Sequence, residues 1–314
     1  MDVTRRLTQL LWTLPILLVT TSLAASPAVG TTPGSNGRIA FSADFGQGYE
    51  VYTVRPNGSG IRQLTQEPRD ATNPDWSPDG RWITFGIESE EHEGIGLMTR
   101  NGHHRRDLTP HGFQLQPAFT PDGNHIVFVG NARRHPSVAI MRLDATHRRQ
   151  LTDPPRRFEG DTDPNVSPDG RIISFVRVKV ADEKQALFTI HRDGTHLHRI
   201  TPYGFDVAVK HDWAPDGRHL VFSRNVDHPH ADQPANVMTI RPDGSGLTNV
   251  TKLTDPDTTA FAGSYSPDGR WIAYRIEDAN GATLHRIRPD GTHDAPILQL
   301  PVPTRFIDWG PRPR

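Results

Sequence analysis

The sequence predicts an all-β chain that folds as a six-bladed β-propeller of four-stranded antiparallel blades, because two short turn motifs recur along it. The first motif is a Pro-Asp-Gly turn between two apolar runs, as in "NPDWSPDGRWITF" (73–85). The aromatic residues that close the copies of this motif are separated by 43 to 52 residues: Phe41, Phe85, Phe128, Phe175, Phe222 and Tyr274. Repeats of this pitch that carry internal turn signals are typical of propellers or helical arrays. No apolar run with the helical period is visible, so we expect blades.

The Pro-Asp-Gly motif indicates a β-hairpin. Pro78 presets φ for the second position of a type I turn, and Asp79 suits the third position. Gly80 can then adopt the positive φ that returns the chain antiparallel to itself. The motif therefore predicts the first two strands of each blade, A before the turn and B after it.

The second motif predicts the two remaining strands, C and D. In "VYTVRPNGSGIRQLT" (51–65), an Asn-Gly turn separates two strand-forming runs, and the second run ends in Leu-Thr. Five related segments follow, with Asp-Gly, Asn-Gly or Asp-Ala at the turn. Asn-Gly and Asp-Gly between alternating apolar residues are strong hairpin signals. Six units of four strands thus make up the predicted propeller.

The last segment, "RFIDWGPRPR" (305–314), predicts how the ring closes. It repeats the first half of the Pro-Asp-Gly motif, with Trp309 at the position of Trp76 and Trp213. The first unit has a strand B but no strand A of its own. We therefore expect residues 305–310 to pair with the first blade, which leaves no long unpaired edge.

The two motifs resemble the PD40 (WD40-like) repeat of TolB-type propellers over residues 37–310. The resemblance rests on the "P.WSPDG..IAF" strand pair and the "I...DG...R.LT" hairpin. It implies the fold firmly and the function weakly, since the same repeat occurs in periplasmic Tol-Pal proteins, in the propellers of prolyl-oligopeptidase-type peptidases and in some polysaccharide lyases. One fold commonly hosts several activities.

The start of the sequence predicts export. Arg5 and Arg6 precede an apolar run, and Ser22 and Ala24 place small residues before a cleavage site, as in a secretory signal peptide. A retained anchor helix is the alternative. We expect a secreted or periplasmic protein without a membrane span after cleavage. The predicted division is a signal peptide at 1–24, a short linker at 25–36 and the propeller at 37–314.

Composition and motifs favour a binding protein over an enzyme. The formal charge of −1 does not favour nucleic-acid binding. The chain has no cysteine, and no Gly-x-Ser-x-Gly, His-Glu-x-x-His or P-loop motif occurs in it. We expect a monomer with no catalytic residues and no cofactor, whose partner is a protein or a cell-envelope component.

Strand A lines the central channel of a propeller, and the D–A and B–C loops emerge on one face. We expect this face to carry the binding site, with Phe113, Phe158, Tyr203, Phe205 and Phe261 as candidate aromatic anchors. Polar residues just before or within strand A are the candidate binding residues: Asn73, Gln116, Asp163, Lys210, His211 and Arg305.

A second polar set precedes or matches the aromatic position of strand A in four blades: Asp75, Asn165, Asp212 and Asp308. We expect these side chains to bond with neighbouring backbone amides. The alternative is that their oxygens hold a divalent cation in the channel.

A metal-dependent carbohydrate-active enzyme is the alternative function. Imidazole and carboxylate groups suit zinc or manganese. The candidate ligands for such an ion all belong to one blade: His211, His228, His230 and Asp232. Most other histidines follow the C–D turns, and we expect them at the outer rim, too far apart to share an ion: His103, His104, His147, His196, His198 and His293.

Overall fold

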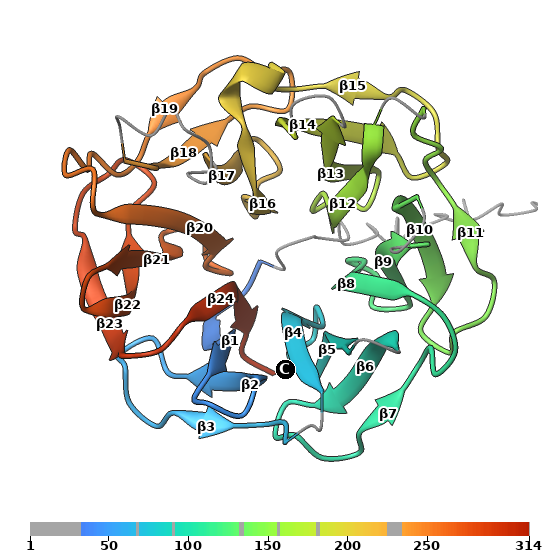
Figure 1. Cartoon of the computed structure of the whole chain (residues 1–314), viewed down its shortest axis with the longest axis horizontal. Coiled ribbons are helices and arrows are strands. Elements are labelled where there is room, and N and C mark those ends of the chain that lie inside the picture. The colour runs from blue at the N-terminus through green and yellow to red at the C-terminus, as the bar shows by residue number, and fades with distance from the viewer. Residues whose placement is uncertain are drawn as a thin grey trace, which may run out of the picture.

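The computed structural model describes residues 33–313, apart from 67–68, 90–91, 132–134, 156–157, 180–182 and 225–233. These residues form six four-stranded antiparallel sheets arranged around a central axis (Figure 1). The predicted six-bladed propeller is therefore confirmed. Most of the predicted signal peptide and linker falls outside the described residues. Within the described part of the chain, no helix is long and apolar enough to cross a membrane.

Each blade has one strand at the channel and three further strands toward the rim. The innermost strands are β4 (Asp70–Trp76), β8 (Gln114–Phe119), β12 (Phe158–Val166), β16 (Val207–Trp213), β20 (Thr259–Tyr265) and β24 (Thr304–Pro311). The second strands are β1 (Asn36–Asp44), β5 (Trp82–Glu88), β9 (His125–Gly130), β13 (Ile172–Lys179), β17 (Leu220–Arg224) and β21 (Ile272–Asp278). The third strands are β2 (Tyr49–Val54), β6 (Glu93–Thr99), β10 (Ser137–Arg142), β14 (Gln185–His191), β18 (Val237–Ile240) and β22 (Gly281–Ile287). The outer strands are β3 (Arg62–Gln63), β7 (Arg106–Asp107), β11 (Arg149–Gln150), β15 (His198–Arg199), β19 (Thr248–Asn249) and β23 (Ala295–Leu300).

We number the blades by their outer strands, so that blade 1 ends in β3 and blade 6 ends in β23. A single 3₁₀ turn, η1 (Tyr203–Phe205), precedes β16 among the described residues. The face that carries the loops between second and third strands, and the loops between blades, is called the loop face. The opposite face, which carries the Pro-Asp-Gly turns, is called the turn face.

The Pro-Asp-Gly turns are built as the sequence predicts. In blade 2, Gly80 has a φ of 67° and donates its N–H to Ser77 O at 2.9 Å. The Ser77 hydroxyl donates to Asp79 Oδ1 at 2.6 Å and accepts from the Trp82 N–H at 2.9 Å. The side chains of Ser77 and Asp79 therefore complete the turn itself.

The ring closes through the last strand. β24 lies antiparallel to β1, with Trp309 opposite Ile39 and Asp308 opposite Ala40. The sheet order β24-β1-β2-β3 makes β24 the inner strand of blade 1. The predicted closure is thereby confirmed, and Figure 1 shows the red β24 beside the blue β1.

The hydrophobic core lies between neighbouring blades. The six repeated aromatic residues have no solvent exposure: Phe41, Phe85, Phe128, Phe175, Phe222 and Tyr274. One cluster joins Ala40 and Val51 of blade 1 to Ile83 and Phe85 of blade 2. Strand B is apolar on both faces because each face packs against another blade, as expected for a sheet covered on both sides.

The Leu-Thr ending of the second motif has a local role. In blade 1 the Thr65 hydroxyl accepts from the Val51 N–H at 2.8 Å, and in blade 2 Thr109 accepts from Ile95 N–H at 2.8 Å. The outer strands of these blades are only two residues long. The threonine hydroxyl therefore satisfies an amide of the third strand just beyond the point where the outer strand stops.

Candidate functional site

The candidate binding residues share one structural position. Asn73, Gln116 and Asp163 have φ values of 48°, 51° and 49°, and each lies at a break in the pairing of its inner strand. Lys210 lies at the corresponding break in β16. Such a bulge adds a residue to the strand and reorients its side chains.

Phe306 occupies the same position in blade 1 and was missed by the sequence reasoning. It lies two residues before Asp308, just as Asn73 lies two residues before Asp75, so aligning the repeats could have identified it. Its φ is 52°. A bulky residue at positive φ is strained, and such strain concentrates at binding and catalytic sites.

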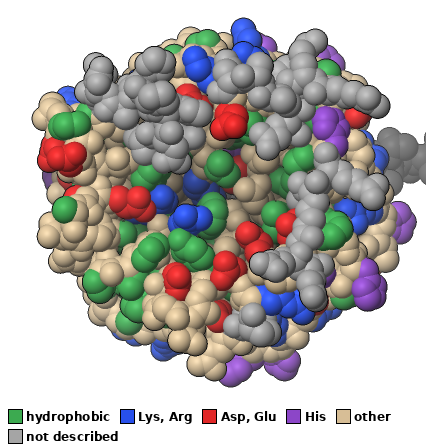
Figure 2. All heavy atoms as spheres, viewed as in Figure 1, with side chains coloured by type: hydrophobic (Ala, Val, Ile, Leu, Met, Phe, Trp, Pro, Cys, Tyr) green, Lys and Arg blue, Asp and Glu red, His purple; other side chains and the backbone are tan. Residues whose placement is uncertain are grey.

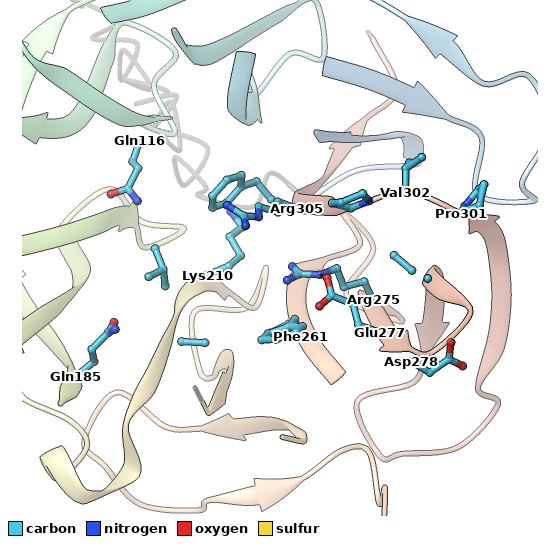
Figure 3. Close-up of a pocket in the computed structure, with 17 residues that line it drawn as sticks. Gln116, Gln185, Lys210, Phe261, Arg275, Glu277, Asp278, Pro301, Val302 and Arg305 are labelled. Carbon is cyan, nitrogen blue, oxygen red and sulfur yellow. Dashed lines mark hydrogen bonds and ion pairs between the residues drawn. The ribbon is translucent and has the colours of Figure 1, made fainter. Parts of the chain in front are cut away.

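Three of the candidate residues, Gln116, Lys210 and Arg305, line one cavity on the loop face (Figure 3). The cavity has a volume of about 750 Å³, which lies in the range of ligand sites. The loop between β23 and β24, together with the end of β21 and the start of β22, forms its side away from the axis. Figure 2 shows Lys and Arg side chains in the central hollow of this face, with Asp and Glu side chains around them.

The cavity combines an apolar wall with a row of cations. Phe261, Val302 and Phe306 supply apolar surface, and Arg275 projects beside Lys210 and Arg305 (Figure 3). Phe261 is the one predicted aromatic anchor that lines the cavity; the side chain of Phe158 lies outside the described part of the chain.

Arg275 is fixed by two contacts and was not predicted from the sequence. Its Nε donates to Glu277 Oε1 at 2.6 Å, and its guanidinium lies 4.1 Å from the centre of the Phe261 ring. Burial and the nearby Arg305 lower the pKa of Arg275, while Glu277 acts in the opposite direction. The signal in the sequence is a charged residue within the apolar strand "WIAYRIED". Arg275 was not among the candidates because it lies on a second strand, and the candidates were all assigned to inner strands.

Lys210 stands where the cavity meets the channel. Burial lowers the pKa of Lys210, but the carboxylates around it outweigh that effect, so the net direction is upward. The contributing carboxylates are Asp163, Asp308, Asp212 and Asp75. Lys210 therefore carries a firmly held positive charge at the base of the cavity.

On the turn-face side of Lys210, polar side chains join neighbouring inner strands by hydrogen bonds to backbone N–H or C=O groups. Asp308 accepts from the Trp76 N–H at 2.8 Å, and Asp75 accepts from the Phe119 N–H at 2.7 Å. Corresponding bonds join other blades: Asp163 N–H to Gln116 Oε1, Asn165 Nδ2 to His211 O, Tyr265 N–H to Asp212 Oδ2, and Trp309 N–H to Ser264 Oγ. We call these six contacts the spokes. The carboxylates and the amide that were candidate cation ligands thus serve as the expected backbone partners.

The spoke carboxylates are costly to ionise. Burial raises the pKa of Asp212 to about 6, although Lys210 opposes the shift. Burial, followed by the charge of Asp308, raises the pKa of Asp75 well above its ordinary value. Folded Asp212 therefore holds its proton at a pH where the unfolded chain has lost it.

We expect the variant Asp212→Asn to remove a pH dependence of stability. Between about pH 4 and pH 6 the unfolded chain has released this proton while the folded chain still holds it. The contribution of the Asp212 carboxyl to the free energy of unfolding therefore falls as the pH rises, and it levels off above this range. The shift of roughly 2 pKa units corresponds to roughly 3 kcal/mol. Urea unfolding at pH 4, 5, 6 and 7 measures the difference between wild type and variant.

Asparagine keeps only one of the two acceptor oxygens of Asp212. The loss of the other changes the free energy of unfolding by an amount that does not vary with pH. Relative to the variant, the wild type should therefore be more stable at pH 4 than at pH 7. Parallel pH curves for the two proteins would contradict the raised pKa.

His211 is enclosed by protein partners. Its side chain has no solvent exposure, Nε2 lies 2.7 Å from Ser174 Oγ, and Nδ1 lies 2.9 Å from Asp163 Oδ2. The other three ligands of the alternative metal site, His228, His230 and Asp232, lie outside the described residues. No cluster of three potential metal ligands occurs among the residues that are described.

The histidines after the C–D turns lie where the sequence predicts. All six are exposed: His103, His104, His147, His196, His198 and His293. Figure 2 shows histidine side chains along the edge of the molecule. Asn73, Asp163 and His211 are close to the channel but do not line the cavity of the loop face.

Comparisons with known proteins agree with this geometry. The family model for the TolB beta propeller domain, PD40, matches residues 97–312. The Tol-Pal system protein TolB of Nitratidesulfovibrio vulgaris is 35% identical over 51 residues, which cover 16% of this chain and 12% of that protein. Matched segments span between 12% and 47% of the lengths of the curated relatives.

Solved structures show the same fold. TolB from Acinetobacter baumannii aligns with a TM-score of 0.72 at 18% identity, over 88% of this chain and 67% of that one. An oligogalacturonate lyase from Vibrio parahaemolyticus aligns with a TM-score of 0.55 at 12% identity, over 84% of this chain and 73% of that one. At these identities the likeness concerns the fold alone. The repeated turns, the closed ring of six blades and the family match over more than half of the sequence establish that the chain belongs to the TolB β-propeller (PD40) family.

Proposed function

We propose that this protein works outside the cytoplasm as a non-catalytic scaffold that binds a protein or another cell-envelope component on its loop face. The observation that carries the proposal is the cavity at the channel mouth, where an apolar wall meets Lys210, Arg275 and Arg305. The Tol-Pal name of one relative supports an envelope partner.

The lining of the cavity indicates the chemistry of the partner. Phe261 and Phe306 offer aromatic surface, and aromatic residues and arginine are enriched among the residues that dominate binding energy. The guanidinium of Arg305 lies 5.0 Å from the Tyr49 ring centre, and its charge counteracts the effect of burial on the pKa of Glu88. A partner segment with an acidic group beside an apolar side chain would match both features.

Site-specific photo-crosslinking tests the proposal. A photoreactive residue at Asp278, on the rim of the cavity, should trap an envelope protein in intact cells, while one at the exposed Arg218 of the turn face should not. The substitution Arg305→Gln should weaken binding of the identified partner about tenfold, because it removes a charged hydrogen bond.

Two controls make this test decisive. Arg218→Gln should leave affinity for the partner unchanged. Identical adducts from both faces, or equal affinity of Arg305→Gln and wild type, would contradict binding in the cavity.

The enzyme alternative has its own test. Stoichiometric zinc, manganese or calcium in the purified protein, lost together with turnover of a polyuronide when His228 and His230 are replaced, would overturn the scaffold proposal in favour of a metal-dependent lyase.

A further inference from the structure

Six arginines surround a second cavity, on the turn face where blades 6, 1 and 2 meet. The cavity has a volume of about 750 Å³. No aspartate or glutamate is found among the described residues that line it. We call it the arginine cleft, and its cations are Arg38, Arg55, Arg62, Arg100, Arg286 and Arg312.

Ring closure assembles the arginine cleft. Arg38 begins the apolar part of β1, while Arg312 follows β24, and its Nε donates to Asn36 O at 3.0 Å. Arg100 follows β6 of blade 2, and Arg286 comes from β22 of blade 6. Residues from both ends of the propeller therefore contribute to one site.

Neutral groups hold the arginines in place. Arg38 donates from Nε to Thr53 Oγ1 at 3.0 Å and from an Nη to Thr53 O at 3.0 Å, and it also bonds to Gly60 O. Arg286 lies 4.9 Å from the centre of the Trp271 ring. These contacts orient the guanidinium groups without neutralising them.

The electrostatics of the cleft are those of crowded cations. Burial, followed by the charges of Arg62, Arg55 and Arg100, lowers the pKa of Arg38 to about 10. The chain as a whole has a formal charge of only −1, so this concentration of positive charge is local.

Two buried donors at the cleft have no hydrogen-bond partner. They are Nε of Arg100 and Nε1 of Trp76, whose side chain is only 7% exposed. Both residues line the cleft. A buried donor without an acceptor is costly, so the wall of the cleft holds more donors than its own acceptors satisfy.

We propose that the arginine cleft binds a multiply charged anion that carries phosphate groups. Guanidinium groups recognise phosphate and carboxylate oxygens through paired hydrogen bonds. A phosphate group brings up to two negative charges and three acceptor oxygens, whereas a carboxylate brings one charge. Neutralising six cations within one small cavity therefore favours linked phosphates. This site lies on the face opposite the proposed partner cavity and does not depend on it.

Isothermal titration with inorganic tripolyphosphate, at constant ionic strength, tests the proposal. The wild type should bind, and the double variant Arg62→Gln/Arg100→Gln should bind about a hundredfold more weakly, at about tenfold per charged hydrogen bond lost. The side chain of Arg62 is exposed, and its loss should not disturb the core. Relief of the repulsion should leave the melting temperature of the ligand-free variant equal to or above that of wild type.

Arg218→Gln is the matched control, because Arg218 is an exposed arginine at a Pro-Asp-Gly turn of blade 5, away from the cleft. It should bind tripolyphosphate as the wild type does. Equal losses in Arg218→Gln and the double variant, or no binding by the wild type, would overturn the site. Citrate binding as tight as tripolyphosphate binding would overturn the assignment to phosphate.

The source of the phosphate is distinguished by sedimentation with vesicles that contain cardiolipin, a lipid whose headgroup carries two linked phosphates. Vesicle binding by the wild type that is lost in the double variant would assign the phosphate to a lipid headgroup. Retained tripolyphosphate binding without vesicle binding would assign it to a soluble anion.

Discussion

Replacing Trp309 by alanine is expected to lower the free energy of unfolding by about 3–5 kcal/mol. Trp309 is only 2% exposed and packs with Ile39, Phe41 and Ile307. The substitution removes apolar contacts and leaves a cavity where the first and last strands of the ring meet. Urea unfolding followed by fluorescence or circular dichroism measures the change.

Truncation after Thr304 should cost more than the point substitution. It removes all but one residue of β24, so that the edge of β1 and the apolar faces beside it become exposed. A truncated protein that melts like the full chain would contradict closure through this strand.

A permuted chain separates closure from chain connectivity. The Arg312 N–H donates to Ser35 O at 2.8 Å, so a short linker can join residues 303–313 ahead of residue 35. This permutant keeps every contact of β24 and should recover the melting temperature of the full chain. Trp271→Ala, which truncates a partly exposed tryptophan beside the same core cluster, should cost less than Trp309→Ala.

Replacing Asp161 by alanine is expected to destabilise the protein by about 3–5 kcal/mol, because it removes the bidentate carboxylate partner of a buried arginine. Arg177 donates from Nε and Nη2 to the two oxygens of Asp161 at 2.5 and 2.8 Å. The side chains are 5% and 0% exposed, and Arg177 also lies over the rings of Phe175 and Phe188. Loss of the carboxylate removes both of these hydrogen bonds and their opposite charge from a guanidinium that is almost fully buried.

The double variant Asp161→Ala/Arg177→Met is the control. Methionine fills much of the arginine volume without a charge, so the double variant should be more stable than Asp161→Ala alone. The exposed pair Arg81 and Asp79, at 3.8 Å, offers a contrast, and Arg81→Ala should cost less than about 1 kcal/mol. A single variant at Asp161 that is as stable as the double variant would contradict the argument.

Much of the fold is predictable from the sequence because each blade repeats the same turn chemistry. Ser77, Asp79 and Gly80 encode a local turn. The half-motif around Trp309 can pair only with the first blade, because that blade alone lacks an inner strand from its own repeat. The strand irregularities that carry Gln116 and Lys210 are less visible, since a bulge depends on how two strands pair. The sequence indicates polar residues near the channel, but not which of them share a cavity.

The arginine cleft could not be predicted from spacing. Arg38 and Arg312 are separated by most of the chain and meet only because β24 pairs with β1. Phe261 could be assigned to the loop face from the repeat, whereas Arg275 required the knowledge that a residue of a second strand reaches the cavity. Closure of the ring creates the arginine cleft, whereas Phe261 and Arg275 meet as direct partners across the β20–β21 pair.

The spokes have a consequence for how such a chain can change over evolutionary time. Because the six spokes, three of them from Asp75, Asp212 and Asp308, fasten each inner strand to the backbone of the next, cohesion at the axis does not rely on the loops above it. Insertions and substitutions in those loops can accumulate while the hub stays intact. Selection can therefore alter what the protein recognises without first having to rebuild the ring.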